Sequence, residues 1–247
     1  MAFRNSYEDA QYARAYATLE FQNTYYLAYR DLPGIFSEHV TGSRALDFGC
    51  GTGRSTRFLR MHGFDVVGVD IAQDMINHAR QRDPAGDYRL IPDGDLSQFG
   101  EATFDLVLSV FTFDNIPTLE KKVAIFESLA TLLATDGRLV NVVSSPDIYT
   151  NEWASFSTKA FPENWRARRG DIVRTVIKDA ASSRPVDDVL WPDDSYQEVF
   201  ARASLTVVAT CRPLASGHEP YPWISETRTA PWVIYILKKT PHRMCGL

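Results

Sequence analysis

Residues 45–53 read A-L-D-F-G-C-G-T-G, a short apolar run that leads into three glycines at alternate positions, Gly49, Gly51 and Gly53. Glycine adopts positive φ angles without steric cost and lets a ligand approach the backbone closely. The stretch therefore predicts a buried strand followed by a nucleotide-binding turn, with a ligand-free strand-to-helix turn as the alternative. The dinucleotide fingerprint G-x-G-x-x-G does not match, because its third glycine would fall on Arg54.

A second apolar run ends in a carboxylate. Residues 64–70 read F-D-V-V-G-V-D, which is the composition of a buried parallel strand closed by Asp70. An acid at this place accepts hydrogen bonds from ribose hydroxyls in nucleotide-binding sheets. The alternative is that Asp70 only stabilises the N-terminus of a helix over residues 71–82. We expect the ligand role because Asp47 and the glycines precede it.

Two further strand-like runs follow. Residues 88–91 read Y-R-L-I and lead into the loop P-D-G-D-L at 92–96. Residues 103–110 read T-F-D-L-V-L-S-V, which has the length and composition of a fully buried strand. Its last residues, Ser109 and Val110, should lie beside a ligand, because open α/β sheets bind their ligands at the carboxyl edge.

These four matches, in order and at the spacing of successive βα units, resemble the class I S-adenosylmethionine (SAM) dependent methyltransferases over about residues 44–144. The alternate glycines, with Asp47 two residues before the first, resemble motif I of that family. The resemblance implies SAM as the cofactor and an acid near 92–96 that meets the adenine amino group. We choose Asp95 for this role, with Leu96 offering a backbone N–H and an apolar surface. Asp93 is the rival, and an ordinary D-G turn is the alternative.

The cofactor-binding residues implied by the resemblance lie on the predicted cap, strand ends and turns. They are Tyr16, Asp47, Gly49, Cys50, Gly51, Gly53, Asp70, Ile71, Met75, Asp95, Leu96, Ser109 and Val110.

The implied fold is α/β: a Rossmann-like, mostly parallel seven-stranded sheet with its last strand antiparallel, helices on both faces and a lid insertion. Tyr16 either reaches the amino-acid end of the cofactor or covers the sheet edge with the neighbouring tyrosines. The expected organisation is an N-terminal helical cap over 1–30, a SAM-binding core over 31–148, a substrate lid over 149–194, and the rest of the core with a closing hairpin over 195–247.

Local signals place the remaining elements. An apolar stripe behind Thr118, a suitable N-cap, predicts a helix over 118–134. Ser195, in the capping-box pattern S-Y-Q-E, predicts the start of another helix. Between strand five and that helix, aromatic residues mixed with prolines predict an irregular and helical insertion that is too long for a bare loop. Strands are predicted over 138–143, 205–211 and 232–237.

Composition limits the function classes. The 247 residues carry 26 Lys and Arg against 31 Asp and Glu, a net charge of −5 without a long basic run, so nucleic acid is not expected as a partner. Three widely spaced cysteines suit a reducing cytoplasm and predict neither disulfides nor a metal site. No apolar run is long enough for a membrane span, and no secretory signal is recognised at the start. The sequence makes no prediction of oligomeric state.

One basic cluster stands out in the lid. It is predicted to be a solvated surface, with recognition of an anionic substrate group as the alternative. Its members are Arg166, Arg168, Arg169 and Arg174.

No catalytic residue is assigned from the sequence. His218 is a weak candidate for a general base because its ordinary pKa lies near neutrality, and its neighbour Glu219 is weaker, as are Glu226 and Asp114. The aromatic and proline-rich loop 214–229 around them is a second candidate wall for an acceptor. The favoured function is methyl transfer from SAM to a small-molecule acceptor by in-line displacement. The alternatives are a tRNA or protein methyltransferase of the same fold and a SAM-binding sensor without catalysis.

Overall fold

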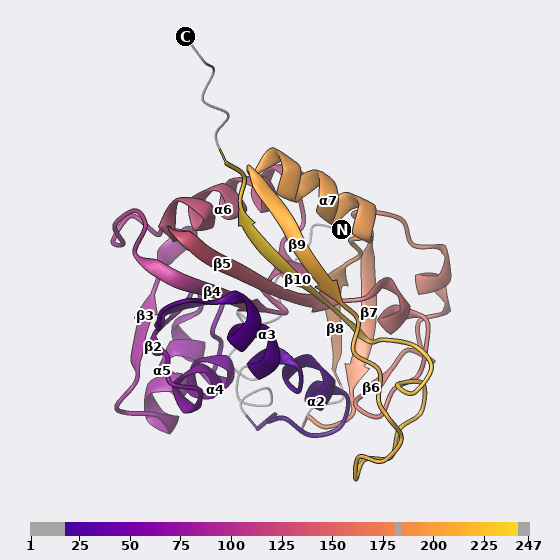
Figure 1. Cartoon of the computed structure of the whole chain (residues 1–247). Helices are drawn as coiled ribbons and strands as arrows, with labels where there is room; N and C mark the ends of the chain where they lie inside the picture. The colour runs from indigo at the N-terminus through magenta and orange to yellow at the C-terminus, as the bar shows by residue number, and fades with distance from the viewer. Residues whose placement is uncertain (1–17, 181–183, 242–247) are drawn as a thin grey trace.

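The computed structural model describes residues 18–180 and 184–241, and its centre is a seven-stranded sheet in the order β3-β2-β1-β4-β5-β10-β9 (Figure 1). Neighbouring strands from β3 to β5 run parallel, and β10 is antiparallel to both β5 and β9. This confirms the predicted α/β, Rossmann-like sheet with an antiparallel last strand. The strands are β1 Arg44–Phe48, β2 Asp65–Asp70, β3 Asp87–Leu90, β4 Phe104–Val110, β5 Leu133–Ser144, β9 Leu205–Cys211 and β10 Trp232–Lys239.

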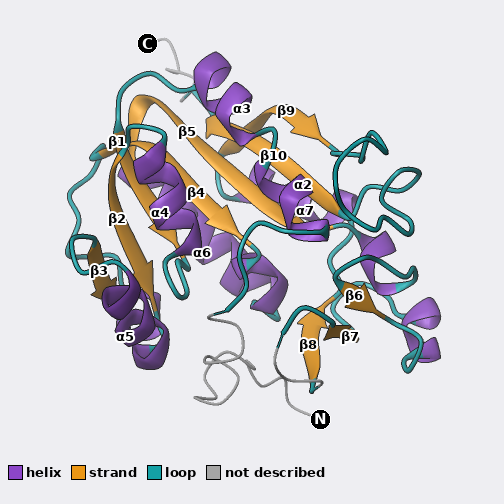
Figure 2. Ribbon diagram, turned by 90° about the horizontal axis from the view of Figure 1, so that it is seen from below, coloured by secondary structure: helices purple, strands orange, loops and turns teal. Residues whose placement is uncertain are grey.

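Helices cover both faces of the sheet (Figures 1 and 2). Apolar side chains of α2, α3 and α4 pack on one face, and those of α6 and α7 pack on the other. The strands in between read as nearly continuous apolar runs because both of their faces are buried. The helices are α2 Thr24–Tyr29, α3 Leu32–His39, α4 Arg54–Met61, α5 Gln73–Arg82, α6 Leu119–Leu132 and α7 Asp193–Arg202.

The insertion forms a second, three-stranded antiparallel sheet of β6 Phe156–Ser157, β7 Ile172–Ile177 and β8 Pro185–Val189. The prediction of an irregular and helical insertion is therefore wrong in its secondary structure. The run I-V-R-T-V-I in β7 buries every second side chain, which is the period of a half-covered strand. Its short helical pieces are two 3₁₀ turns, η4 Pro146–Tyr149 before the sheet and η5 Pro162–Arg166 within it.

The insertion sheet lies beyond the carboxyl ends of β4 and β5 (Figure 1). Strand β8 contacts η3 Thr112–Asn115, the 3₁₀ turn that follows β4. Apolar residues of the insertion belong to the same core as α2 and the start of β10. This edge of the main sheet is therefore covered by a second, separately built layer.

Two helix starts test the capping predictions. Thr118 caps α6, and its Oγ1 accepts a hydrogen bond from the backbone N–H of Lys121 at 3.2 Å. The capping box at Ser195 is wrong, because α7 begins two residues earlier, at Asp193, directly after Pro192. Two aspartates, at 193 and 194, then occupy the first turn, where negative charge favours the helix dipole.

No helix within the described ranges combines the length and the apolar character needed to cross a bilayer. The predicted cap begins outside the described residues, and Tyr16 lies among those that the structure does not describe.

Candidate cofactor and acceptor site

The glycine turn between β1 and α4 has the backbone conformation that its sequence predicts. Gly49, Gly51 and Gly53 have φ angles of 75°, 53° and 82°. A Cβ at Gly49 would lie 2.1 Å from Thr112 Oγ1, and one at Gly53 would lie 2.6 Å from the Tyr88 hydroxyl. A Cβ at Gly51 would have the Met75 sulfur, 4.0 Å away, as its nearest neighbour. Gly49 and Gly53 are thus required by the protein's own packing, whereas Gly51 borders space that a ligand can enter.

Asp70 holds this turn from the end of β2. One carboxylate oxygen accepts the backbone N–H of Gly51 at 2.8 Å, and the other accepts that of Ala72 at 2.8 Å. Burial raises the pKa of Asp70, while these hydrogen bonds act in the opposite direction. Each carboxylate oxygen has a second lone pair, so the group can accept further hydrogen bonds from a ligand at Gly51.

Asp47 is fully buried beneath the same turn. Its Oδ2 accepts hydrogen bonds from the hydroxyls of Ser55 and Thr56, both at 2.6 Å. Its Oδ1 has no partner within residues 18–180 and 184–241. Burial raises the pKa of Asp47 to about 6 despite the two hydrogen bonds. An unpartnered buried acceptor is costly, and a bound cation that donates to it would remove that cost.

The other predicted cofactor residues differ in exposure. Asp95 is exposed after β3, where its carboxylate accepts the backbone N–H of Ser97 at 2.8 Å, and Leu96 beside it is buried. Ile71 is exposed at the end of β2. The side chain of the rival Asp93 is not described. The remaining positions lie at the carboxyl edge: Met75 and Cys50 are buried, Ser109 is buried with no partner for its hydroxyl in the described chain, and Val110 is half-buried.

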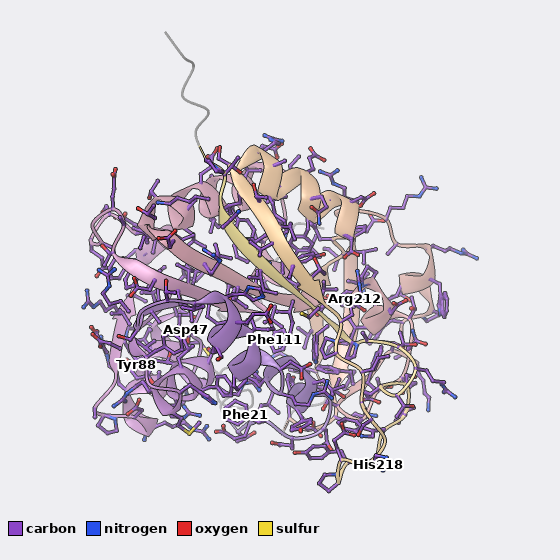
Figure 3. The ribbon with its side chains drawn as sticks, viewed as in Figure 1. Phe21, Asp47, Tyr88, Phe111, Arg212 and His218 are labelled. Carbon is purple, nitrogen blue, oxygen red and sulfur yellow. The ribbon has the colours of Figure 1, made fainter. Side chains whose placement is uncertain are left out.

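Phe111 lies between the glycine turn and the pocket that is described next. It follows β4 directly and has a φ of 64°, an unusual value for a residue other than glycine. Its ring packs 4.5 Å from that of Trp232, and the Arg54 guanidinium lies 4.7 Å from the ring of Tyr25 beside it. Figure 3 shows Asp47 and Phe111 near one another in the middle of the molecule. This unusual backbone conformation places the Phe111 ring between the glycine turn and that pocket.

A small pocket, partly open to solvent, lies between the main sheet and the insertion. It is referred to below as the acceptor pocket. Its wall combines aromatic and aliphatic side chains with carboxyl, amide and hydroxyl groups. The lining residues are Tyr25, Phe111, Asp114, Asn115, Ser144, Ile148, Tyr149, Phe156, Thr175, Ile177, Val186, Asp188 and Trp232.

The two carboxylates of the acceptor pocket come from segments far apart in sequence. Asp114, on η3, accepts the backbone N–H of Ser144 at 3.0 Å, and Asp188, on β8, accepts the Tyr149 hydroxyl at 3.3 Å. Burial raises the pKa of Asp114 to about 6 and that of Asp188 well above its ordinary value. Burial also lowers the pKa of Lys122, beneath the pocket, to about 7, although the nearby carboxylates favour its charged form.

The sequence candidates for a general base lie elsewhere. His218 is exposed on the loop 214–229, far from Asp47 and Phe111 in Figure 3. The Glu219 carboxylate is occupied by the backbone of Ser216 and the indole of Trp223, and its pKa falls to about 2 because these hydrogen bonds outweigh desolvation. Glu226 is buried and joins the Thr24 hydroxyl at 2.6 Å. None of these three residues is among the described residues that line the acceptor pocket.

Most residues that line the acceptor pocket are not among the sequence candidates. Asp114 is one of the weaker candidates, yet it follows β4 at the edge where such sheets bind ligands, and that position is a signal in the sequence. Asp188 and Tyr149 had no comparable signal, because their meeting depends on the antiparallel pairing of β7 with β8. The Arg cluster lies away from the pocket lining: Arg169 pairs with Glu198 and Arg174 with Asp187.

Comparison with known proteins finds a family match within the main sheet. Residues 46–141 match the family described as a methyltransferase domain. The chain is 36% identical over 104 residues to a demethylmenaquinone methyltransferase of Tropheryma whipplei, with 41% of each chain covered. It is 36% identical over 106 residues to an 18S rRNA (guanine-N(7))-methyltransferase of Bos taurus, covering 38% of this chain and 37% of that one.

A solved structure extends the likeness to the whole fold. A SAM-dependent methyltransferase from Clostridium acetobutylicum superimposes with a TM-score of 0.63 at 12% identity, covering 94% of this chain and 98% of the other. In contrast, the matches span 61% or less of the length of the curated relatives, and 41% and 37% of the two named above. The family match, over residues 46–141, includes the glycine turn and ends before the insertion.

Proposed function

We propose that this chain, whose residues 46–141 match a methyltransferase domain and whose fold is that of a SAM-dependent methyltransferase, methylates a small organic acceptor bound in the acceptor pocket. The observation that carries the proposal is the position of that pocket. Phe111, directly after β4, lines it, and residues of the 149–194 insertion supply much of the rest of its wall. The insertion then acts as the substrate lid.

The residues around the glycine turn fit SAM. The free Oδ1 of Asp47 suits the ammonium of the cofactor's amino-acid end, and Asp70 suits the ribose hydroxyls. The open side of Gly51 lies between them. We assign Asp95 and Leu96 to the adenine end, at the loop after β3. When bound, SAM supplies an electrophilic methyl group on a sulfonium that leaves in line with the attacking atom.

This chain's own contribution is mainly orientation and the exclusion of water. The aromatic wall of Tyr25, Phe111 and Trp232 fixes an acceptor between the sheet edge and the lid. Orientation of this kind supplies about 7–11 kcal/mol of rate enhancement in favourable cases. A carboxylate such as Asp114 is close enough to the pocket to take a proton from an acceptor that must lose one.

The shape and charge of the site support a small acceptor over RNA or protein. The pocket is a concave site walled by residues of both the main sheet and the insertion, as sites for small molecules usually are. A nucleic acid needs clustered cationic side chains for its phosphates, and two arginines of the basic cluster in the lid are already paired with carboxylates. Because one relative is an rRNA methyltransferase, RNA is the alternative acceptor, and the experiment includes it.

Calorimetry and turnover test the proposal in sequence. The protein is titrated with S-adenosylhomocysteine and with NAD, then incubated with methyl-labelled SAM and either a metabolite extract or total RNA. We expect the first ligand to bind, NAD not to bind, and label to enter the small-molecule fraction. Label in RNA alone would replace the small-acceptor proposal, and binding without any transfer would favour a SAM sensor.

A further inference from the structure

We propose that the acceptor pocket selects an acceptor that carries an amine, and that the amine nitrogen receives the methyl group. This inference rests on the proposed function and names its substrate class. It follows from three features of the pocket: the kind of polar groups that line it, the rings around them, and the balance of charge beneath them.

The polar groups of the pocket are predominantly hydrogen-bond acceptors. Asp114 and Asp188 both line the pocket, one on η3 of the main sheet and the other on β8 of the lid, which contacts η3. The Oδ1 atom of Asn115 is buried and has no partner in the part of the chain that the structure describes. The Tyr149 hydroxyl is already directed to Asp188. A ligand that donates several hydrogen bonds fits these groups, and an ammonium has three N–H donors.

The apolar wall suits the same kind of ligand. The rings of Tyr25, Phe156 and Trp232 lie within 5.2–6.1 Å of one another, and Phe111 closes the group on the side of the glycine turn. Aromatic faces attract cations through their quadrupole, and they repel anions for the same reason. The rings of Tyr25 and Phe111 already face the Arg54 guanidinium, at 4.7 and 6.0 Å from their centres. The rings of Phe156 and Trp232 therefore add to the selection for a positively charged group on an organic body.

The buried lysine beneath the pocket does not cancel this preference. The Lys122 ammonium donates to the backbone carbonyl of Phe113 and lies 4.9 Å from the ring centre of Trp191, in the layer below the pocket. One ammonium thus faces two carboxyl groups. The titratable groups around the pair come from four elements besides η3 and β8: Lys122 on α6, Tyr149 on η4, Tyr196 on α7 and Tyr235 on β10.

Burial raises the pKa of Asp188 well above its ordinary value, with Asp114 adding to the effect, so protonation of this carboxyl is favoured when no cation is bound. A bound cation favours the doubly ionised pair and so releases that proton.

In the reaction the proton moves the other way. An ammonium N–H passes its proton to the carboxylate, the nitrogen keeps the electron pair and bonds the methyl carbon of SAM, and the S–C bond breaks with its electrons left on sulfur. The products are a methylated ammonium and S-adenosylhomocysteine, and charge is conserved.

A matched set of small probes tests the inference by binding alone. Benzylamine, benzyl alcohol and benzoate share one ring and differ in the head group. They are titrated at pH 7.5 into the protein saturated with S-adenosylhomocysteine, and binding is followed by NMR line broadening and calorimetry. We expect benzylamine to bind at least tenfold more tightly than the alcohol, and benzoate not to bind. Equal affinities, or preference for benzoate, would overturn the inference.

Two variants locate the preference. Asp188→Asn, which preserves shape, should reduce the amine-to-alcohol ratio at least fivefold. Asp187→Asn makes the same chemical change one residue away, where the carboxylate pairs with Arg174 at 2.8 Å outside the pocket lining, and should leave the ratio unchanged. An equal loss in both variants would contradict the assignment. If Asp188→Asn does not fold, the amine-to-alcohol affinity ratio of the wild-type protein still tests the proposal.

Proton release gives a second readout. Benzylamine binding is measured by calorimetry in phosphate and in Tris, whose ionisation enthalpies differ. Wild type should release a fraction of a proton near neutrality, and Asp188→Asn should release less; equal release would count against the role of this carboxyl.

The same samples separate the two proposals. Failure to bind S-adenosylhomocysteine removes the proposed function, whereas normal cofactor binding without amine preference removes only this inference.

Discussion

The glycine-turn side and the acceptor-pocket side of this molecule are assembled in opposite ways. The glycine turn, Asp47 and Asp70 lie within one β1-α4-β2 stretch of 27 residues from Arg44 to Asp70, and parallel pairing of β1 with β2 brings them together. The acceptor pocket draws on residues from 25 to 232, contributed by α2, η3, β5, the insertion sheet and β10. The first site is a local arrangement of backbone and acids, and the second is a product of long-range packing.

This difference explains where the similarity to the methyltransferase domain family is found. The matched residues 46–141 include the glycine turn and end before the insertion. A local site constrains a short stretch of sequence strongly, because the backbone conformation itself makes the site. A site made by packing constrains scattered positions, which can change together with the acceptor.

The largest effect is expected for Gly49→Ala. The new methyl group would combine the strain of a φ of 75°, about 1–2 kcal/mol, with a 2.1 Å approach to Thr112 Oγ1 that adds about 1–3 kcal/mol of overpacking. We expect binding of S-adenosylhomocysteine to be lost and unfolding in urea to shift accordingly. Gly63→Ala is the control, because φ is 86° there with no atom within 4 Å. If both variants lose equal stability and keep the ligand, the turn does not form the site.

Asp70→Ala should come next. It removes a charged acceptor from the ligand and from the N–H of Gly51, so affinity for S-adenosylhomocysteine should weaken by about 1.5–3 kcal/mol. Calorimetry measures the effect directly. Asp65→Ala, at the exposed opposite end of the same strand, should leave affinity unchanged. Unaltered affinity in the Asp70 variant would show that ribose is held elsewhere.

The pH dependence of cofactor affinity isolates Asp47. Because its pKa is raised to about 6, Asp47 takes up a proton as the pH falls through 6, whereas a bound ammonium requires the carboxylate. Affinity for S-adenosylhomocysteine should therefore fall by up to about tenfold per pH unit below 6. Asp47→Asn should show weaker binding at pH 7.5 and a flatter profile. Parallel profiles would place the ammonium away from Asp47.

The same group has the opposite effect on folding. A carboxyl whose pKa is higher in the folded than in the unfolded state stabilises the fold as it is protonated, between about pH 6 and its unfolded pKa near 4. Asp47 thus contributes less stability at pH 7 than at pH 5. Unfolding free energies of wild type and Asp47→Asn should converge as the pH falls through this window, if the asparagine variant is the more stable one at pH 7.

The smallest effect is expected on the pocket side. Tyr149→Phe removes the hydroxyl that donates to Asp188, which is worth about 0.5–1.5 kcal/mol. The KM for the acceptor found in the turnover screen should rise a few-fold, with affinity for S-adenosylhomocysteine unchanged. Tyr221→Phe, on the loop 214–229, should change neither quantity. A loss of cofactor affinity in the Tyr149 variant would mean that the glycine turn and the acceptor pocket are coupled, and the contrast between them would have to be abandoned.

Sequence patterns served best where a local constraint acts on consecutive residues. The alternate glycines predicted positive φ angles because the turn leaves no alternative conformation for that backbone, and all three have them. The apolar runs predicted the parallel strands because burial on both faces demands continuous apolar character. Ser195 shows the limit: its capping-box pattern was present, but Pro192 and two aspartates start the helix earlier.

The sequence by itself determined the sheet, the glycine turn and the acids at the strand ends, since each depends on neighbours within a few residues or on a regular strand period. Only the tertiary structure decided that the insertion is a small antiparallel sheet and that Asp188 meets Asp114 across a pocket. Those contacts join segments separated by about 70 residues, and no local period records which distant strand a segment will face. The physical reason is that packing selects among many partners, whereas backbone geometry leaves few.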